Sequence, residues 1–323
     1  MIPTFVNFDV EPAGFQRDQT SWRGFREWVD LVDGIRRELA DRTGRSPRFG
    51  WYFRMDPQIA TVHGDAAYAA RRFTDLVEHL EEQGDVFGMH VHPLRWSDEQ
   101  QLWVHDLADH DWMAHCIQTA HAAYTDFFGI PPVRFRGGGG FLDEELVEVI
   151  DRLGVRVDLT LEPGFQWPAH QLRTEVDVSP CVGSSVDCST APRAVYRPSV
   201  HDFRRPDATG GRRVVMVPLS ASARMPEKPA WWRVARALRH PRGRRARVVR
   251  PASRWPSPTF FWDLLAAEAG SARKSHISLA VRADPLAGAG AARAAALLRA
   301  LPAHALAGRL DCSDPCTEAP QLV

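Results

Sequence analysis

Short apolar segments and amphipathic segments alternate along the first 160 residues of the chain. The apolar segments have the length and the Val and Phe content of buried strands, and they span 5–8, 49–53, 86–91, 133–135 and 155–159. Between them, the helical spacing of apolar residues predicts helices that end at Gly44, Gly84, Gly129 and Gly154. This order predicts an α/β fold with a parallel, barrel-like sheet.

The alternation is weaker beyond residue 163, but it continues. We expect strands at 194–196 and 214–217, a helix near 260–269, a last strand at 277–281 and an alanine-rich helix from about 287 to 301. Residues 224–258 are rich in Arg, Pro and Trp and are predicted to form an insertion, and the tail from about 311 is predicted to be a surface coil. Because barrels of this size are commonly one domain, we expect a single domain over 1–323.

Composition excludes few functions for this chain. Forty basic and 40 acidic residues give a formal net charge of zero, so charge provides no argument for nucleic acid or a membrane surface. No run of about 18 apolar residues occurs, and no secretory signal is visible at the start. Together with an odd number of cysteines, five, this leads us to expect a reduced, cytoplasmic protein.

Two short motifs at strand ends carry the strongest chemical signal. Asp9 and Glu11 lie two residues apart after the first predicted strand, and His90 and His92 lie two apart at the end of the third. Residues two apart on a strand share a face, and the carboxyl ends of parallel strands meet at one end of a barrel. Mixed carboxylate and imidazole ligation with an open position is typical of a hydrolytic metal site.

Charged residues also follow the other predicted strands, whereas the strand bodies are mostly apolar. They are Arg54, Asp56, Arg136, Arg282 and Asp284. We expect Arg54, Asp56, Arg282 and Asp284 to contact substrate, although Arg54 and Asp56 could also pair with each other. Catalytic groups of parallel α/β barrels lie at this end of the strands.

Two further features near these motifs are candidates for substrate binding. Gly138 belongs to the run of four glycines after Arg136, where the backbone could approach a substrate closely. Trp96 follows the histidines and is either a platform for a sugar ring or a loop anchor.

In order and context, these motifs resemble those of the polysaccharide deacetylases of carbohydrate esterase family 4, over roughly residues 1–165. The resemblance implies a distorted (β/α) barrel of about seven parallel strands and removal of an acetyl group with a divalent metal. It also implies that Asp9 is the catalytic base, that Glu11, His90 and His92 bind the metal, and that Arg136 orients Asp9 and keeps it ionised.

The chain departs from the family pattern in four places. The acids are separated by one residue rather than adjacent, the histidines are two rather than four apart, and glycines replace a proline–aromatic pair after Arg136. The family's final strand also delivers a histidine that protonates the leaving group, but here Leu279 is followed by Ala280 and Val281. Asp284 or a histidine of the 105–115 segment could supply this proton.

Two other segments concentrate polar residues. His105, His110 and His115 are spaced five apart, which does not place them on one helix face, so we predict a solvated, polar helix start there. Residues 233–254 contain nine arginines. They could bind a phosphate, an anionic lipid or nucleic acid, but the neutral overall charge favours a surface insertion that covers the site.

These observations predict a metal-dependent hydrolase that removes an acetyl group from an intracellular amino sugar, sugar conjugate or small glycoside, with or without a phosphate. Zinc is the expected metal, and cobalt, nickel, iron or manganese would also suit the ligands. The alternatives are hydrolysis of another non-peptide C–N bond and a catalytically inactive carbohydrate- or anion-binding protein. We expect neither a nucleic-acid partner nor a membrane span.

Overall fold

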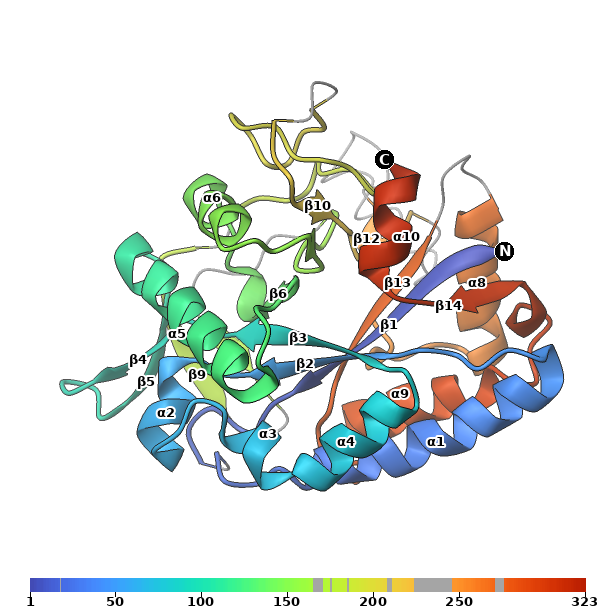
Figure 1. Cartoon of the computed structure of the whole chain (residues 1–323), viewed down its shortest axis with the longest axis horizontal. Coiled ribbons are helices and arrows are strands. Elements are labelled where there is room, and N and C mark those ends of the chain that lie inside the picture. The colour runs from blue at the N-terminus through green and yellow to red at the C-terminus, as the bar shows by residue number, and fades with distance from the viewer. Residues whose placement is uncertain are drawn as a thin grey trace, which may run out of the picture.

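The computed structural model describes residues 1–17, 19–164, 171–174, 176–184, 186–207, 211–223, 246–270 and 276–323. A parallel sheet that curves as a half-barrel lies at its centre (Figure 1). Seven of its strands follow one another in space, in the order β10 (Val215–Met216), β7 (Val157–Asp158), β6 (Arg134–Gly137), β3 (Val86–Val91), β2 (Gly50–Arg54), β1 (Ile2–Val10) and β13 (Ile277–Arg282). The predicted distorted barrel of parallel strands is confirmed.

Helices surround this sheet. They are α1 (Arg23–Thr43), α2 (Pro57–His63), α3 (Tyr68–Arg72), α4 (Thr74–Glu82), α5 (His110–Phe128), α6 (Glu144–Arg152), α8 (Pro258–Gly270), α9 (Ala289–Ala300) and α10 (Pro315–Leu322). Helices α1, α4 and α9 lie along one side of the sheet in Figure 1. Helix α1 buries Trp28 against Phe8 of β1, with ring centroids 5.5 Å apart, and ends at Gly44 in the predicted left-handed conformation. Among the described residues, no helix has the length and apolarity needed to cross a bilayer.

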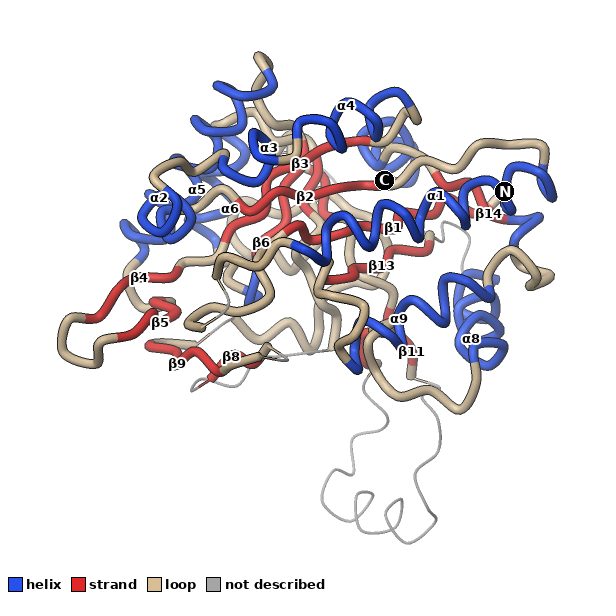
Figure 2. The backbone as a smooth tube through the Cα atoms, turned by 90° about the horizontal axis from the view of Figure 1, so that it is seen from below, coloured by secondary structure: helices blue, strands red, loops and turns tan. Residues whose placement is uncertain are grey.

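A second, four-stranded sheet was not predicted. Its strands are β4 (Leu94–Ser97), β5 (Leu102–Asp106), β9 (Val178–Val182) and β8 (Gln171–Arg173), in that spatial order. Figure 2 shows this smaller sheet as a layer of its own beside the main one. It matters for function because β4 follows His92 after only one further residue, so the smaller sheet begins at the candidate metal site.

The prediction of a surface coil after residue 311 is wrong. Strand β14 (Leu310–Cys312) pairs in parallel with the start of β1, and α10 follows it. The side chain of Asp314 caps α10 by accepting a hydrogen bond from the Cys316 N–H at 2.8 Å, and it also accepts one from Arg134 Nε at 2.9 Å. These contacts bury Cys316 in the fold.

The predicted insertion lies largely outside the described residues, which exclude 224–245. At its two ends, β11 (Ala221–Ser222) and β12 (Arg247–Val248) pair antiparallel. The described residues on either side of 224–245 therefore lie next to each other. Its role and the single-domain organisation stay predictions.

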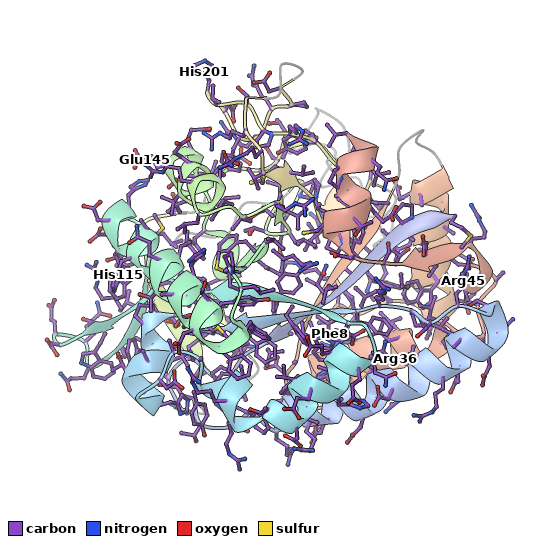
Figure 3. All side chains as sticks on the ribbon, viewed as in Figure 1. Phe8, Arg36, Arg45, His115, Glu145 and His201 are labelled. Atoms are coloured by element: carbon purple, nitrogen blue, oxygen red, sulfur yellow. The ribbon has the colours of Figure 1, made fainter. Side chains whose placement is uncertain are left out.

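A buried ion pair connects α1 to the amino-terminal end of the sheet. Arg36 of α1, labelled in Figure 3, donates two hydrogen bonds to Asp85, at 3.0 and 2.7 Å. Asp85 also accepts hydrogen bonds from the Phe49 N–H at 2.9 Å and from Trp51 Nε1 at 2.8 Å. Because each partner of Asp85 is a buried donor, loss of this carboxylate would leave several donors unsatisfied.

We therefore expect Asp85→Ala to lower the free energy of unfolding by about 3–5 kcal/mol, the usual cost of removing one partner of a buried ion pair. Urea denaturation measures this value. Asp75→Ala is the matched control, because Asp75 pairs with Arg26 at 3.0 Å on the surface, where solvent screens the pair, and its loss should change stability far less. Equal effects of the two substitutions would contradict the assignment of Asp85.

Candidate metal centre

The register of the main sheet brings the predicted strand-end residues to one level. Arg54 of β2 pairs with His90 of β3, His90 pairs with Arg136 of β6, and Asp9 of β1 pairs with Arg282 of β13. All these pairings are parallel, so the side chains gather where the carboxyl ends of the strands meet.

Glu11, His90 and His92 form a compact group of metal-competent side chains. One ligand atom from each lies within 4.8 Å of the others, and all three residues are buried. His92 Nε2 lies 3.2 Å from Glu11 Oε2, and His90 Nε2 lies 3.8 Å from Glu11 Oε1. Three protein ligands of this type leave room for a water or substrate, as catalytic zinc sites require.

Two buried atoms of this group make no hydrogen bond, namely Glu11 Oε2 and His90 Nε2. The other nitrogen of His90, Nδ1, lies 2.8 Å from the Arg136 carbonyl oxygen. Because a carbonyl can only accept, Nδ1 carries the proton and Nε2 presents a lone pair. Buried polar atoms without partners are costly, and a cation between these two would satisfy both. The residues therefore fit a divalent metal.

The charges of the group also suit a cation. Burial alone would raise the pKa of Glu11, but Arg282, His92 and His90 outweigh it and hold that pKa well below its usual value. Burial lowers the pKa of His92 to about 4, although Glu11 acts in the opposite direction. An ionised carboxylate and a neutral imidazole are the forms that bind metals.

Asp9 is held apart from this group by Arg136. Arg136 Nε lies 2.7 and 3.0 Å from the two oxygens of Asp9, and its Nη1 donates to the Leu159 carbonyl oxygen at 2.8 Å. Burial lowers the pKa of Arg136, but Asp9 and Glu162 raise it more, so the net shift is upward and Arg136 stays charged. Asp9 is thus an oriented carboxylate beside the metal-competent group.

Arg54 and Asp56, predicted to contact substrate, are both fully buried and pair with each other at 2.7 Å. Asp56 also accepts a hydrogen bond from the His92 main-chain N–H at 2.9 Å, and Arg54 Nη1 lies 3.7 Å from Glu11 Oε2. Both residues therefore position metal-competent side chains. Substrate contact by either one stays a prediction.

Arg282 and Asp284 lie at the end of β13. Arg282 Nη1 lies 3.2 Å from Glu11 Oε1, and its Nε donates to Asp284 Oδ1 at 2.7 Å. Arg282 thus occupies the last position of the strand that supplies a histidine in the deacetylase pattern. His276 lies at the other end of this strand, as expected, and contacts the Pro218 carbonyl oxygen at 2.8 Å.

Gly138 contacts a metal-competent side chain directly. A Cβ added at this position would lie 2.0 Å from His92 Nε2. The glycine is therefore required for the approach of His92, whereas the sequence predicted an approach of substrate. Trp96, predicted to be either a sugar platform or a loop anchor, is 42% exposed on β4 and packs against Trp103 with ring centroids 5.5 Å apart.

Sequence reasoning missed His105. It was predicted to belong to a solvated helix start, but it lies on β5, is fully buried, and its Nε2 is 2.9 Å from His92 Nδ1. The β-favouring Trp103 and Val104 beside it are the signal that could have indicated a strand. The other two histidines belong to α5: His110 contacts Asp143 at 3.0 Å, and His115 lies on the outer surface (Figure 3).

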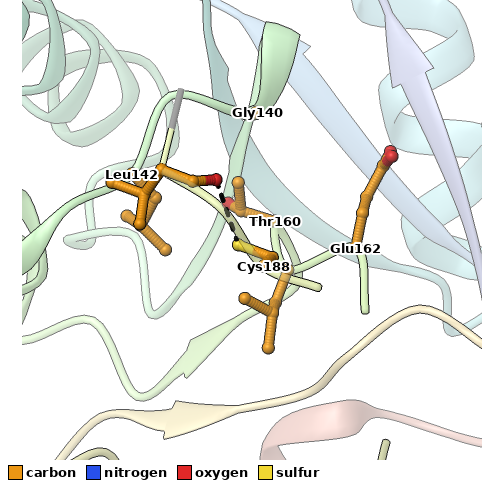
Figure 4. Close-up of a pocket in the computed structure, with 7 residues that line it drawn as sticks. Gly140, Leu142, Thr160, Glu162 and Cys188 are labelled. Carbon is orange, nitrogen blue, oxygen red and sulfur yellow. Dashed lines mark hydrogen bonds between the residues drawn. The ribbon is translucent and has the colours of Figure 1, made fainter. Parts of the chain in front are cut away.

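A small pocket opens at the carboxyl ends of β6 and β7 (Figure 4). Gly140, Thr160, Glu162 and Cys188 are among its lining residues. The pocket adjoins the candidate site. Its lining residue Thr160 accepts a hydrogen bond at Oγ1 from the Gly137 N–H at 2.7 Å, and Gly137 directly follows Arg136. Glu162 forms an ion pair with Arg250, which belongs to the predicted arginine-rich segment.

Asp158, which accepts hydrogen bonds from the pocket residue Thr160, makes folding stability depend on pH. Burial raises its pKa to about 7, although hydrogen bonds from Thr160 and the charge of Arg136 oppose the shift. The folded chain therefore keeps a proton on Asp158 that the unfolded chain releases near pH 4. Since the folded state binds more protons between these values, its stability falls as pH rises from 4 to 7.

Asp158→Asn should remove this dependence, because the amide mimics the protonated carboxyl and can keep both hydrogen bonds to Thr160. Relative to the variant, we expect the wild type to lose up to about 4 kcal/mol of unfolding free energy between pH 4 and pH 7. Urea denaturation of both proteins across this range measures the difference. Parallel pH profiles would contradict the prediction.

No family model matches the chain, and no curated protein sequence matches it. Solved structures do match. A Mycobacterium smegmatis protein described as a proposed polysaccharide deacetylase is 14% identical, with a TM-score of 0.50 over 99% of this chain and 89% of that chain. The allantoinase PuuE is 11% identical, with the same TM-score and the same two coverages. This similarity shows that the chain has the barrel fold of polysaccharide deacetylases and of allantoinase.

Proposed function

We propose that this chain is a metal-dependent hydrolase that removes an acetyl group from the nitrogen of an amino sugar, sugar conjugate or small glycoside. One observation carries the proposal. The buried group of Glu11, His90 and His92 lies beside the Asp9–Arg136 pair at the catalytic end of a deacetylase-like barrel.

Each residue of this group has a separate role in hydrolysis. A divalent metal held by Glu11, His90 and His92, with zinc best suited to this ligand set, supplies Lewis acidity toward water and the acyl carbonyl. Asp9 accepts the proton of the attacking water as the general base, while Arg136 keeps this carboxylate ionised and oriented. No histidine stands at the end of β13, so we assign return of the proton to the leaving amine to Asp9 itself.

A second candidate is hydrolysis of another non-peptide C–N bond. Its support is the end of β13, where Val281 stands at the position of the deacetylase histidine and Arg282 follows it, and the match to allantoinase over 99% of this chain. A third candidate, an inactive carbohydrate- or anion-binding protein, is favoured by Arg54 and Arg282, because their guanidinium groups lie 3.7 and 3.2 Å from Glu11 and add positive charge at the site.

The cytoplasmic location and a phosphate-bearing substrate stay part of the proposal. Five free cysteines, of which Cys116 and Cys316 are buried, support a reducing compartment. Charge reversal at Arg250, the described member of the arginine-rich segment that pairs with Glu162, should raise KM for phosphorylated but not for neutral substrates. An equal change for both substrates would remove the phosphate from the proposal.

The test of the reaction is product release from the zinc-loaded protein. We expect acetate from members of a panel of N-acetylated amino sugars and their phosphates, no ring-opened ureido acid from cyclic ureides, and no ammonia from linear ureides. Ureide hydrolysis without acetate release would support the second candidate. A folded protein that binds zinc but hydrolyses neither panel would contradict the proposed reaction.

A further inference from the structure

We propose that His105 is a positioning residue that sets the tautomer of His92 so that His92 Nε2 can bind the metal. This inference rests on the proposed metal site and goes beyond it, because it assigns a function to a residue outside the Glu11–His90–His92 group. Its basis is the contact of 2.9 Å between His92 Nδ1 and His105 Nε2.

Both rings are fixed in orientation by their surroundings. His105 is fully buried on β5, where it pairs with Leu94 of β4 across the hairpin. The main-chain N–H of His92 is bound by the side chain of Asp56 at 2.9 Å. The ring of Phe15 packs against both imidazoles, with centroid distances of 5.0 Å to each. The contact between the two rings is therefore part of a packed structure.

A neutral imidazole carries one proton, so one nitrogen can be a ligand only if the other one is protonated. His90 meets this condition by donating from Nδ1 to the Arg136 carbonyl oxygen. Within the described part of the chain, His92 Nδ1 has His105 Nε2 as its hydrogen-bond partner, and His105 Nε2 must then act as the acceptor. The proton of His105 then lies on its Nδ1, an atom that is buried without a hydrogen-bond partner.

The opposite placement of the two imidazole protons suits the protein without metal. With the proton on His105 Nε2, His92 Nδ1 accepts, and the proton of His92 lies on Nε2, which faces Glu11 Oε2 at 3.2 Å. Both rings stay neutral in either assignment, so the exchange between them neither takes up nor releases a proton. His105 can thus support both arrangements, and only the first leaves the lone pair of His92 Nε2 available.

Zinc affinity tests this role with two substitutions of different hydrogen-bonding capacity. In His105→Leu the acceptor is lost, and we expect the zinc dissociation constant to rise about 10- to 100-fold, as for other partners of metal-bound histidines. In His105→Gln the side-chain oxygen can accept from His92 Nδ1, so we expect a rise of no more than about fivefold. Competition with a chromogenic chelator measures both dissociation constants. The control is His276→Leu, because His276 is a buried histidine at the other end of β13, and this substitution should leave zinc affinity unchanged.

Each outcome decides a separate question. Wild-type affinity in His105→Leu, or equal losses in the Leu and Gln variants, would overturn the acceptor role while leaving the metal site intact. Absence of zinc binding by the wild type would refute the proposed function and this inference with it. Should His105→Leu not fold, nitrogen-15 NMR of the zinc-loaded wild type still decides, because a proton on His105 Nε2 instead of Nδ1 would overturn the inference.

Discussion

Gly138→Ala should abolish productive metal binding in an otherwise folded protein. The added methyl group would lie 2.0 Å from His92 Nε2 and 2.4 Å from the two neighbouring ring carbons, so His92 would have to move. His92 cannot move freely, since Asp56 binds its main chain and His105 contacts its other ring nitrogen. We expect zinc affinity to fall by about 100-fold or more, and turnover to fall with it.

Gly34→Ala is the matched control for this substitution. A Cβ at Gly34, within α1, would meet no atom within 4 Å, so stability should rise slightly, by up to about 1 kcal/mol, and zinc affinity should stay unchanged. Zinc titration and thermal unfolding of both variants give the comparison. Wild-type zinc affinity in Gly138→Ala would show that His92 is not a ligand in this orientation.

The pair Glu11→Gln and Asp9→Asn should separate metal binding from base catalysis. Glu11 lies at the centre of the metal-competent group, so its amide variant should lose zinc and reduce kcat/KM by about a thousandfold or more. Asp9 contacts Arg136 and lies 3.9 Å from His90 Nδ1, so its amide variant should keep zinc. Loss of the general base should still lower kcat by about 100- to 10,000-fold.

Zinc content and kcat, measured on the same samples, decide between the two roles. Both substitutions keep the size of the side chain, which makes each variant a control for the other. Loss of zinc from Asp9→Asn would make Asp9 a ligand, and retention of zinc by Glu11→Gln would remove Glu11 from the metal site.

The parts of the site that lie on regular strands could be predicted from the sequence. Strand alternation places Asp9 and Glu11 on one face, and parallel register places His90 and Arg136 at the same level, because both effects depend only on local spacing and strand order. The same reasoning predicted the barrel from the alternation of strands and helices, because α1, α4, α5 and α6 each end at or near a glycine that marks their boundary.

The parts that depend on contacts between distant segments could not be predicted. His105 reaches His92 only because a hairpin folds back after β3, and its spacing from His110 and His115 gave no sign of this. A glycine run shows that something approaches the backbone but does not identify it, so Gly138 was assigned to substrate and not to His92. Similarly, the short tail had too little apolar periodicity to indicate β14, which depends on pairing with β1.

The most direct test of the central claim is the zinc stoichiometry of the purified, folded wild type after incubation with zinc and removal of the excess. We predict about one zinc ion per chain, as for a site with three protein ligands, and its loss in Glu11→Gln. A folded wild-type chain that retains no zinc, and no cobalt or manganese under the same conditions, would contradict a metal-dependent hydrolase and leave the anion- or carbohydrate-binding alternative.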